Sequence, residues 1–500
     1  MTKKFFLKIH PNDSVMVALK DLKKGDFVEV DGLTVQIQED IDYGHKFAIK
    51  DMAENEDIIK YGFPIGHAIK AIQPGEWVHT HNVKTNLEGK LEYSYKFKQS
   101  TGKHGDLPGN RTFQGYVRKN GDVGIRNEIW IINTVGCINK TAEILAKLGN
   151  ERFGNGKIDG VFHFPHPFGC SQLGDDLKNT QLLLRNLVQH PNAGGVLVLG
   201  LGCENNNIPF FKDVLGQFDE ERVKFLGVQS VDDEIDEGIE LLEELVQYAS
   251  TFERQPVPVS KLKVGLKCGG SDGLSGITAN PLVGAFSDDL IAAGGTTVLT
   301  EVPEMFGAEM MLMERAKDEA TFRNIVDLVN DFKDYFIKHD QPVYENPSPG
   351  NKKGGITTLE EKSLGCVQKG GSSIINDVLD YGGIVTKQGL NLLQGPGNDL
   401  VSVTSLAASG AQLVLFTTGR GTPFGGPVPT VKISSNTALS TRKKNWIDFD
   451  AGRLVGDSSM DELRSELFQY IISVASGETV THNEKNGYKE ISIFKDGVFL

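Results

Sequence analysis

Every cysteine in the chain stands beside a glycine. The five pairs are Gly136-Cys137, Gly169-Cys170, Gly202-Cys203, Cys268-Gly269 and Gly365-Cys366. The chain has 57 glycines in 500 residues. At that content a given residue has a glycine neighbour by chance roughly one time in five. A cysteine that only fills a core needs no such neighbour. We therefore interpret the thiols as functional groups, which the glycines allow to approach a ligand closely.

What these thiols can do depends on where they lie in the fold. Runs rich in β-branched residues predict a strand just before most of them. The predicted strands are Glu128-Thr134, Ile158-Phe162, Gly195-Leu199, Val223-Val228, Leu262-Leu266, Thr296-Thr300, Gln412-Phe416 and Thr430-Ser434. Amphipathic stretches typical of helices lie between many of them: Thr141-Leu148, Asp232-Ala249, Thr321-His339 and Met460-Ser473. This alternation predicts parallel sheets with crossover helices.

Ligands bind beyond the carboxyl ends of the strands in open parallel sheets. The segments that follow the predicted strands carry Cys137, HFPHPFGC (163–170), GLGCENN (200–206), KCGGSDG (267–273), Glu301, Glu304 and TTGRGTPFGG (417–426). Four thiols, two histidines (His163 and His166), two glutamates, Asp272 and Arg420 thus occupy positions at the ligand-binding edge. We expect them to form one site.

Two chemistries suit this set: metal binding by thiolate, imidazole and carboxylate, or catalysis by one activated thiolate with a base. Metal binding is favoured because ligands gather from several strands. The chain has no C-x-x-C pair, so a zinc ribbon is not indicated, and a single ion or an iron–sulfur cluster both stay open. Bland alternatives exist. A strand-end cysteine is often inert. The alternative role of Glu301 and Glu304 is to cap a helix, and Arg420 is either an anion clamp or part of a surface turn.

The chain divides into several parts. Residues 1–87 predict a small β domain, with alternating runs at 26–30 and 33–37 joined by an Asp31-Gly32 turn. Residues 88–112 are polar and predict a linker that lies across another domain or subunit. An α/β domain over 113–250 and a second one over 261–500 follow, with 251–260 predicted as the linker between them.

Composition excludes several function classes. Net charge is −14, which disfavours nucleic-acid and membrane-surface binding. No apolar run is long enough to span a bilayer, and the N-terminus does not resemble a signal peptide. An odd number of cysteines without an export signal predicts reduced thiols and a cytoplasmic location. Neither G-x-G-x-x-G nor a Walker sequence is present, so a nicotinamide or ATP enzyme is not supported.

Several long motifs carry a resemblance to a known family. They are GHK (44–46), YGFPIGHAI (61–69), HPFGC (166–170), GLGCE (200–204), KCGGSDGLSGITANP (267–281), TEVPE (300–304), NPSPGNKKGG (346–355) and TTGRGTPFG (417–425). The sequence resembles the altronate/galactarate dehydratase family over nearly its whole length. The resemblance implies an α/β protein with a small N-terminal β-clip domain of the SAF type, followed by Rossmann-like parallel-sheet domains. It also implies dependence on iron(II), with an iron–sulfur cluster or another divalent metal as alternatives, and a homodimer.

Two features favour the altronate branch of this family: WVHTHN at 77–82 and the thiol of Cys366, which otherwise stands apart from the other four. The resemblance implies dehydration of D-altronate to 2-dehydro-3-deoxy-D-gluconate by removal of the C2 proton and loss of the C3 hydroxyl. The alternatives are a galactarate dehydratase, a related sugar-acid or sulfolactate lyase, or a sugar-acid sensor without turnover.

Roles can be assigned to residues as expectations. A base with a pKa near 7 and fixed positive charge are needed to form an enediolate. We expect His45, Lys46 and His166 to be catalytic. We expect substrate binding by His79, His81, Arg126, Ser271, Asp272, Arg420 and Thr422. We expect the metal to be held by Cys137, Cys170, Cys203, Cys268 and Glu301.

Overall fold

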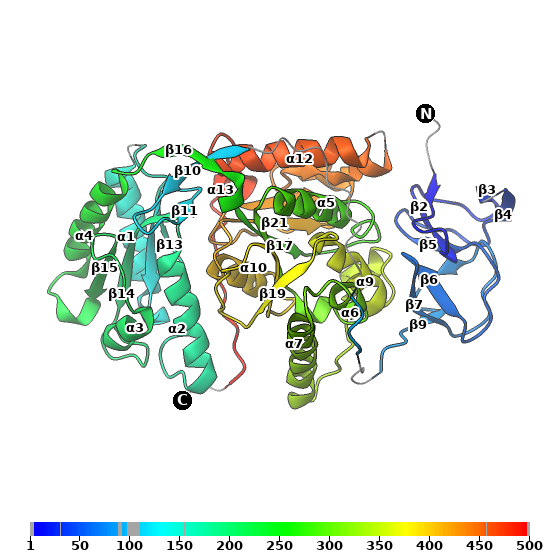
Figure 1. Ribbon diagram of the computed structural model, residues 1–500, viewed down its shortest axis with the longest axis horizontal. Coiled ribbons are helices and arrows are strands. Elements are labelled where there is room, and N and C mark those ends of the chain that lie inside the picture. The colour runs from blue at the N-terminus through cyan, green and yellow to red at the C-terminus, as the bar shows by residue number, and fades with distance from the viewer. Residues whose placement is uncertain are drawn as a thin grey trace.

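The computed structural model describes residues 5–30, 32–88, 93–97, 111–154, 156–456 and 458–497. Figure 1 shows three domains in a row. The C-terminal domain lies in the middle, with the N-terminal β domain on one side and the second domain on the other. None of the described helices has the length and apolar character to cross a membrane.

The N-terminal domain is built from short strands. They are β1 (Phe6–Leu7), β2 (Val15–Ala18), β3 (Phe27–Val30), β4 (Leu33–Gln36), β5 (Lys46–Ala48), β6 (Asp57–Lys60), β7 (Phe63–Ala68), β8 (Trp77–Val78) and β9 (Val83–Lys84). They form sheets β1-β2-β5-β8, β3-β4 and β6-β7-β9. The predicted hairpin is confirmed: β3 and β4 pair antiparallel, and alternation buries Val28 and Val30 while Phe27 and Glu29 face solvent. Asp31 of its turn lies outside the described residues.

The segment predicted as a linker is described only in part, since residues 89–92 and 98–110 lie outside the described residues. Two tyrosines between those gaps lie on the C-terminal domain. The Tyr93 hydroxyl donates to Glu309 at 3.0 Å, and the Tyr95 hydroxyl donates to the carbonyl of Ala316 at 3.2 Å. This part of the chain therefore packs along the C-terminal domain.

The second domain contains a parallel sheet in the order β13-β12-β14-β15. Its strands are β12 (Glu128–Asn133), β13 (Val161–His163), β14 (Ala193–Gly200) and β15 (Val223–Gly227). Helices α1 (Asn139–Phe153) and α4 (Glu234–Ala249) share one hydrophobic cluster with the sheet. Helices α2 (Gly174–Gln189) and α3 (Ile208–Leu215) belong to another cluster, which continues into the C-terminal domain. The prediction of parallel strands with crossover helices is confirmed here.

The segment 251–260, predicted as the linker between the two α/β domains, contains a strand. Residues Arg254–Pro258 form β16, which pairs antiparallel with β10 (Thr112–Val117). β10 also pairs with β11 (Val123–Gly124). Prolines are tolerated because β16 is the edge strand of this sheet and has only one hydrogen-bonded neighbour.

The C-terminal domain holds a seven-stranded parallel sheet in the order β19-β20-β18-β17-β21-β22-β23. The strands are β17 (Lys263–Cys268), β18 (Thr296–Leu299), β19 (Ile375–Leu379), β20 (Gly389–Leu393), β21 (Leu413–Thr418), β22 (Thr430–Ser434) and β23 (Phe449–Asp450). The main helices are α5 (Ala279–Ala292), α7 (Glu319–Lys338), α9 (Leu359–Cys366), α10 (Asp399–Ala408) and α12 (Met460–Ala475). Strands β19, β20 and β23 were not predicted. Buried Asn391 interrupts the apolar run of β20, and its amide donates to the carbonyls of Lys387 and Gly389.

A buried ion pair joins the second domain to the C-terminal domain. The Arg126 guanidinium contacts Glu484 of α13 (His482–Lys485), with Nε–Oε1 at 2.6 Å, and it also donates to the carbonyls of Ile125 and Val474. The expectation that Arg126 binds substrate is therefore corrected, because its donors are already used inside the protein. Burial would raise the pKa of the Glu484 carboxyl, but the charge of Arg126 outweighs it and lowers that pKa to about 2.

The Glu484→Gln variant tests this ion pair. The pKa of a glutamate in the unfolded chain is about 4.3. Because the pKa of Glu484 is lower in the folded protein, its ionised form stabilises the fold above about pH 4.3. This stabilisation is lost as the pH falls from about 4.3 towards 2. We expect the variant to lose about 3 kcal/mol of unfolding free energy at pH 7, with the difference from wild type shrinking below pH 4. Urea unfolding at a series of pH values measures it.

The matched control is Glu466→Gln, which breaks the exposed Arg453–Glu466 pair. It should cost about 1 kcal/mol at most. Equal losses in the two variants, or a Glu484→Gln loss independent of pH, would contradict the role of this pair.

Candidate active site

A cavity of about 480 Å³ opens at the carboxyl edge of the seven-stranded sheet. Its wall includes Cys268 at the end of β17, Glu304 in the segment after β18, and Asp399 at the start of α10. Ser271, Asn351 and Lys362 also line it, with aromatic side chains of α7 on one side. This is where ligands bind in open parallel sheets, and the volume suits a small organic acid.

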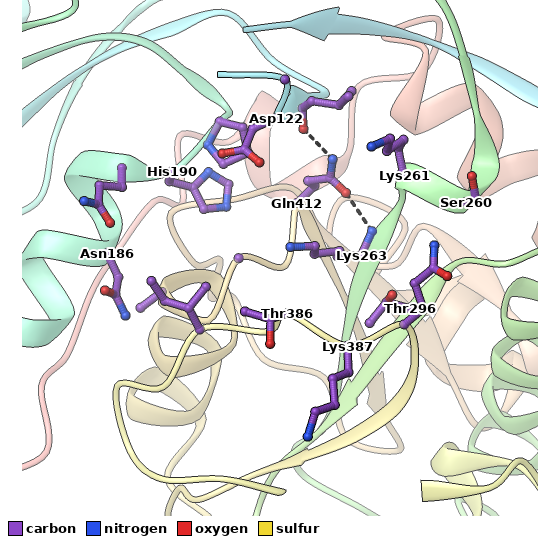
Figure 2. A pocket seen from close by; sticks show the side chains of 18 residues that line it. Asp122, Asn186, His190, Ser260, Lys261, Lys263, Thr296, Thr386, Lys387 and Gln412 are labelled. Carbon is purple, nitrogen blue, oxygen red and sulfur yellow. Dashed lines mark hydrogen bonds between the residues drawn. The ribbon is translucent and has the colours of Figure 1, made fainter. Parts of the chain in front are cut away.

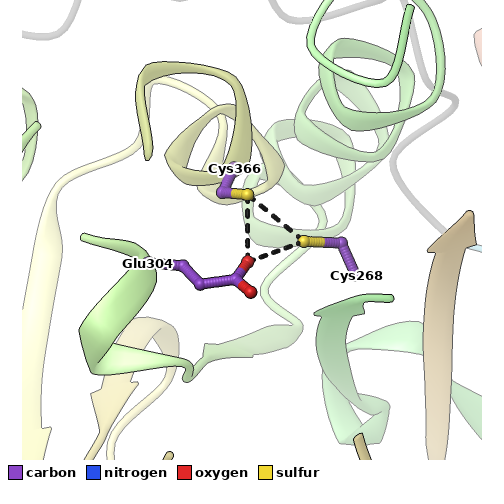
Figure 3. Close-up of side chains that lie close together, drawn as sticks. All are labelled: Cys268, Glu304 and Cys366. Carbon is purple, nitrogen blue, oxygen red and sulfur yellow. Dashed lines mark hydrogen bonds between the residues drawn. The ribbon is translucent and has the colours of Figure 1, made fainter. Parts of the chain in front are cut away.

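Two thiols and a carboxylate lie close together beside this cavity, and two of the three residues, Cys268 and Glu304, line it (Figure 3). The sulfur atoms of Cys268 and Cys366 lie 3.3 Å apart, and each lies 3.1 Å from Oε2 of Glu304. All three residues are buried, and both cysteines are free thiols. Cys366 ends helix α9 and so differs from the four strand-end thiols as expected, but its sulfur lies beside that of Cys268, which the sequence did not predict.

A second carboxylate lies behind the first. Glu301 accepts hydrogen bonds from Lys267 and from the backbone N–H of Cys268, and its Oε1 lies 3.7 Å from the Cys268 sulfur. Its backbone is left-handed, with φ +73°. This conformation is uncommon for a residue with a side chain and is found mostly where the surroundings enforce it.

Three buried lysines balance the carboxylates. Lys267 pairs with Glu301 and with Asp399 at 3.0 Å, Lys369 pairs with Glu301 at 3.2 Å, and Lys362 pairs with Glu304 at 2.7 Å. Isolated charges would be strongly destabilising at this depth, so each ion requires its partner.

This arrangement sets the protonation states. Burial would raise the pKa of the Glu304 carboxyl, but Lys362, Lys267 and Lys369 outweigh it and hold that pKa well below its usual range. The hydrogen bond to Cys268, together with burial, raises the pKa of the Cys366 thiol well above its usual value. Near neutral pH the site therefore contains an ionised carboxylate beside a protonated thiol.

Helix α9 ties this site to the N-terminal domain. All eight of its residues are buried. Glu360 accepts hydrogen bonds from Thr85 and Asn86, and Glu361 contacts Nζ of Lys46 at 2.8 Å and Nζ of Lys60 at 2.6 Å. The N-terminal domain thus fixes the helix that carries Lys362 and Cys366.

Of the residues expected to bind substrate, the structure places some at the cavity and others away from it. Ser271 lines the cavity, and its buried hydroxyl has no hydrogen-bond partner among the described residues. Asp272 accepts from Leu274, Ser275, Ser435 and Asn436, so its carboxylate organises loops. The exposed Arg420 lies at 3.5 Å from the Gly350 carbonyl, and Thr422 accepts a hydrogen bond from Lys432 through its carbonyl. Neither Arg420 nor Thr422 lines the cavity.

The histidines of the N-terminal domain lie at its boundary with the C-terminal domain, outside the cavity lining. His45 contacts the Lys353 carbonyl at 3.3 Å, and His79 contacts the Lys352 carbonyl at 2.9 Å. Trp77 stacks on His79 and also contacts the exposed His81. Burial lowers the pKa of His79 to about 4, so this imidazole is neutral near pH 7.

Two other residues expected to be catalytic are already engaged. His166 is buried, its Nε2 lies 2.8 Å from the Asn133 carbonyl, and its Nδ1 accepts from the Phe168 backbone. It therefore has no ring nitrogen left to act as a base. Lys46 is held between Glu361 and the Gly355 carbonyl, and burial lowers its pKa to about 8. These contacts assign Lys46 to domain docking.

The thiols expected to form one site are divided between two sheets. Cys137, Cys170 and Cys203 follow strands of the second domain and are exposed. Among the described residues, the metal-ligating group whose ligand atoms all lie within 4.8 Å is Cys268, Glu304 and Cys366. The expected single set is corrected accordingly: Cys268 and Glu301 lie in the C-terminal domain, whereas Cys137, Cys170 and Cys203 lie in the second domain.

The sequence placed Glu304 at the same edge as Cys268, but it did not reveal Cys366 as their partner or the roles of Lys267, Lys362 and Lys369. Two signals were available. KCGG places a lysine next to a strand-end thiol, and EEKSLGC places two acidic residues and a lysine on a short helix that ends in cysteine.

Another cavity, of about 290 Å³, is shown in Figure 2. It lies at the amino ends of β17 and β18, where Lys263 and Thr296 begin those strands. Its histidine, His190, uses both ring nitrogens in hydrogen bonds. Its location at the opposite edge of the sheet and its lack of thiols make it a weaker candidate.

The fold and the site define a three-domain α/β protein with a buried thiol–carboxylate centre. Its three regions match the family models described as the altronate/galactarate dehydratase SAF domain (residues 4–86), the D-galactarate dehydratase/altronate hydrolase second domain (115–250), and the D-galactarate/altronate dehydratase C-terminal domain (259–499).

Full-length relatives agree with this match. The chain is 56% identical to an altronate dehydratase of Bacillus subtilis (strain 168) and 54% identical to one of Escherichia coli (strain K12), in each case over 99% of this chain and 100% of the relative. It is 33% identical to a galactarate dehydratase (L-threo-forming) of Escherichia coli (strain K12), over 98% of this chain and 96% of the relative. The chain therefore belongs to the altronate/galactarate dehydratase family.

The Glu361→Gln variant tests the docking of the N-terminal domain on α9. It leaves two buried ammonium groups without their common carboxylate, and we expect a loss of about 3–5 kcal/mol in unfolding free energy. Hydrogen exchange should show faster opening of 359–366 in the variant. Glu56→Gln, which breaks the exposed Lys50–Glu56 pair, is the matched control and should change stability by about 1 kcal/mol at most. If both variants behave alike, Glu361 does not anchor the domain.

Proposed function

We propose that this protein is a hydro-lyase that converts D-altronate to 2-dehydro-3-deoxy-D-gluconate and water in the 480 Å³ cavity. The observation that carries the proposal is the cluster of Cys268, Cys366 and Glu304 beside a cavity that is lined by Cys268, Glu304, Lys362 and Asp399. The sequence identity to altronate dehydratases supports the choice of substrate.

The proposal includes a divalent metal, with iron(II) as the ion that the family resemblance implies. The residues present fit such an ion, because two sulfur atoms and one carboxylate oxygen from three elements lie within 3.3 Å of one another. Thiolates and a carboxylate together suit iron. The ion would supply a Lewis acid that stabilises negative charge developing on the substrate.

The protein's own residues would bind the substrate and move its proton. Lys362 presents an ammonium group at the cavity wall, where it can pair with the substrate carboxylate, and the Ser271 hydroxyl is free to bind a substrate hydroxyl. The surrounding apolar and aromatic wall limits water, which strengthens both contacts.

Asp399 is the proposed acceptor of the C2 proton. Both Asp399 and Glu304 line the cavity and pair with a lysine, but the Asp399 side chain is 28% exposed and the Glu304 side chain only 6%, so Asp399 is the more accessible to substrate. Gly269 permits its approach: a Cβ atom at that position would lie 2.6 Å from Oδ2 of Asp399. Asp399 then passes the C2 proton to the C3 hydroxyl, which leaves as water and returns the carboxylate to its ionised form, and the enol tautomerises to the 2-keto acid.

We further propose that the protein acts in the cytoplasm as a homodimer. Its five cysteines are free thiols, which suits a reducing compartment. The family resemblance is the support for the dimer, and light scattering on the purified protein measures it.

The Asp399→Asn variant tests the proton acceptor. We expect kcat for altronate to fall by about 10²–10⁴-fold, since general-base catalysis contributes that much, while iron content stays unchanged. Asp175→Asn, at the exposed start of α2, is the control and should keep wild-type kcat. Full activity in the Asp399→Asn variant would show that Asp399 does not accept the C2 proton.

The metal site is tested by Cys268→Ser and Cys366→Ser. Serine keeps the size of the side chain but supplies no thiolate, so both variants should lose iron in elemental analysis together with altronate turnover. Retention of both iron and activity would contradict thiolate ligation.

The second candidate function is a related lyase. The 33% identity to a galactarate dehydratase favours galactarate as its substrate, and a 32% identity to a (2R)-sulfolactate sulfo-lyase subunit beta favours sulfolactate. Incubation of the protein with altronate, galactarate and sulfolactate, followed by a 2-keto acid assay, separates the candidates. We expect the highest kcat/KM with altronate. A higher value with either alternative substrate would replace the proposed one.

A further inference from the structure

Three exposed thiols of the second domain are not used by the cavity. Cys137 follows β12, Cys170 follows β13 and Cys203 follows β14. These strands are neighbours in the order β13-β12-β14, and they run parallel. The three thiols therefore come from adjacent loops at one carboxyl edge.

These loops are bonded to one another through their backbones. The Gly136 N–H donates to the Phe168 carbonyl at 2.8 Å, and the Asn206 N–H donates to the Gly169 carbonyl at 3.1 Å. The Asn206 amide also donates to the Thr134 carbonyl at 3.0 Å, so one side chain connects the first loop to the third. The thiol-bearing loops thus form one connected unit.

Glycines permit this close approach. A Cβ atom at Gly169 would lie 2.0 Å from the Thr134 carbonyl oxygen, and one at Gly136 would lie 2.5 Å from the His166 carbonyl oxygen. Gly169 and Gly202 also have positive φ angles of +100° and +132°. Each glycine directly precedes one of the three cysteines, so the backbone is shaped around the thiols.

The surroundings disfavour simpler uses of these thiols. A nucleophilic cysteine needs a base, but neighbouring His166 uses both ring nitrogens. A single ion would need the three sulfur atoms close together, yet they do not all lie within 4.8 Å of one another. The thiolate ligands of a cluster stand farther apart, because each binds a different iron.

We propose that Cys137, Cys170 and Cys203 form a three-thiolate site for a [4Fe–4S] cluster on the second domain, separate from the centre of Cys268, Cys366 and Glu304. Three ligands leave one iron without a protein donor. Because all three thiols are exposed, that iron would be accessible to an oxygen ligand such as a carboxylate or hydroxyl group.

The cluster would bind by ligand exchange without a change in oxidation state. Three protein thiols replace three small thiolates of a preformed [4Fe–4S] complex, forming three Fe–S bonds and breaking three. Each protein thiol gives its proton to a departing thiolate. The inference depends on the thiols of the second domain and not on the proposed dehydration, so either can fail alone.

The test is anaerobic exchange of the full-length protein with a preformed [4Fe–4S] 2-mercaptoethanol complex, followed by desalting. We expect wild-type protein to retain acid-labile sulfide together with an equal amount of iron, apart from any iron held by Cys268, Cys366 and Glu304, and to show the visible absorption of an iron–sulfur cluster. Cys137→Ser, Cys170→Ser and Cys203→Ser should each lose most of the sulfide. These side chains are exposed, so circular dichroism should show wild-type folding in all three variants.

Cys366→Ser is the matched control, because it removes a thiol of the other centre, and it should retain wild-type sulfide. The proposal is overturned if wild-type protein retains no sulfide, if it retains iron without sulfide, or if Cys366→Ser loses as much sulfide as the three variants of the second domain.

Discussion

The structure depends on the burial of one short polar helix. α9 has the sequence LEEKSLGC, and all of its residues are buried. Burying such charges is tolerated only when each one meets an opposite charge or a set of hydrogen bonds. Glu360 and Glu361 find their partners in the N-terminal domain, whereas Lys362 and Cys366 find theirs in Glu304 and Cys268. The helix therefore joins the docking of a domain to the geometry of the site.

The need to pair buried charges across the fold also explains which site residues could be predicted from the sequence. The strands and the thiols at their ends were predictable, because β-branched runs and glycine punctuation are local signals. The partnership of Cys268 with Cys366 was not, because 98 residues separate them and Cys366 ends a helix rather than a strand. Charge pairing across domains leaves no local pattern either, so Lys267 and Lys369 could not be recognised before the fold was known.

Two residues with corrected roles show that the same side-chain types serve catalysis and internal hydrogen bonding. His166 and Arg126 both have the chemistry of catalytic groups, yet each satisfies buried backbone carbonyls. A motif shared with a family is therefore not by itself a sign of catalysis, since internal hydrogen bonds need particular residues as well. The glycines beside the thiols likewise serve packing and chemistry together: Gly269 makes room for Asp399, and Gly169 makes room for Thr134.

The central claim is that Cys268, Cys366 and Glu304 hold the ion on which the proposed dehydration depends. X-ray absorption at the iron edge tests it most directly, using anaerobic protein in which the three thiols of the second domain are replaced by serine and one equivalent of iron(II) is added. The account predicts two sulfur neighbours at thiolate bonding distance, together with oxygen. An iron shell made of oxygen and nitrogen alone would contradict it.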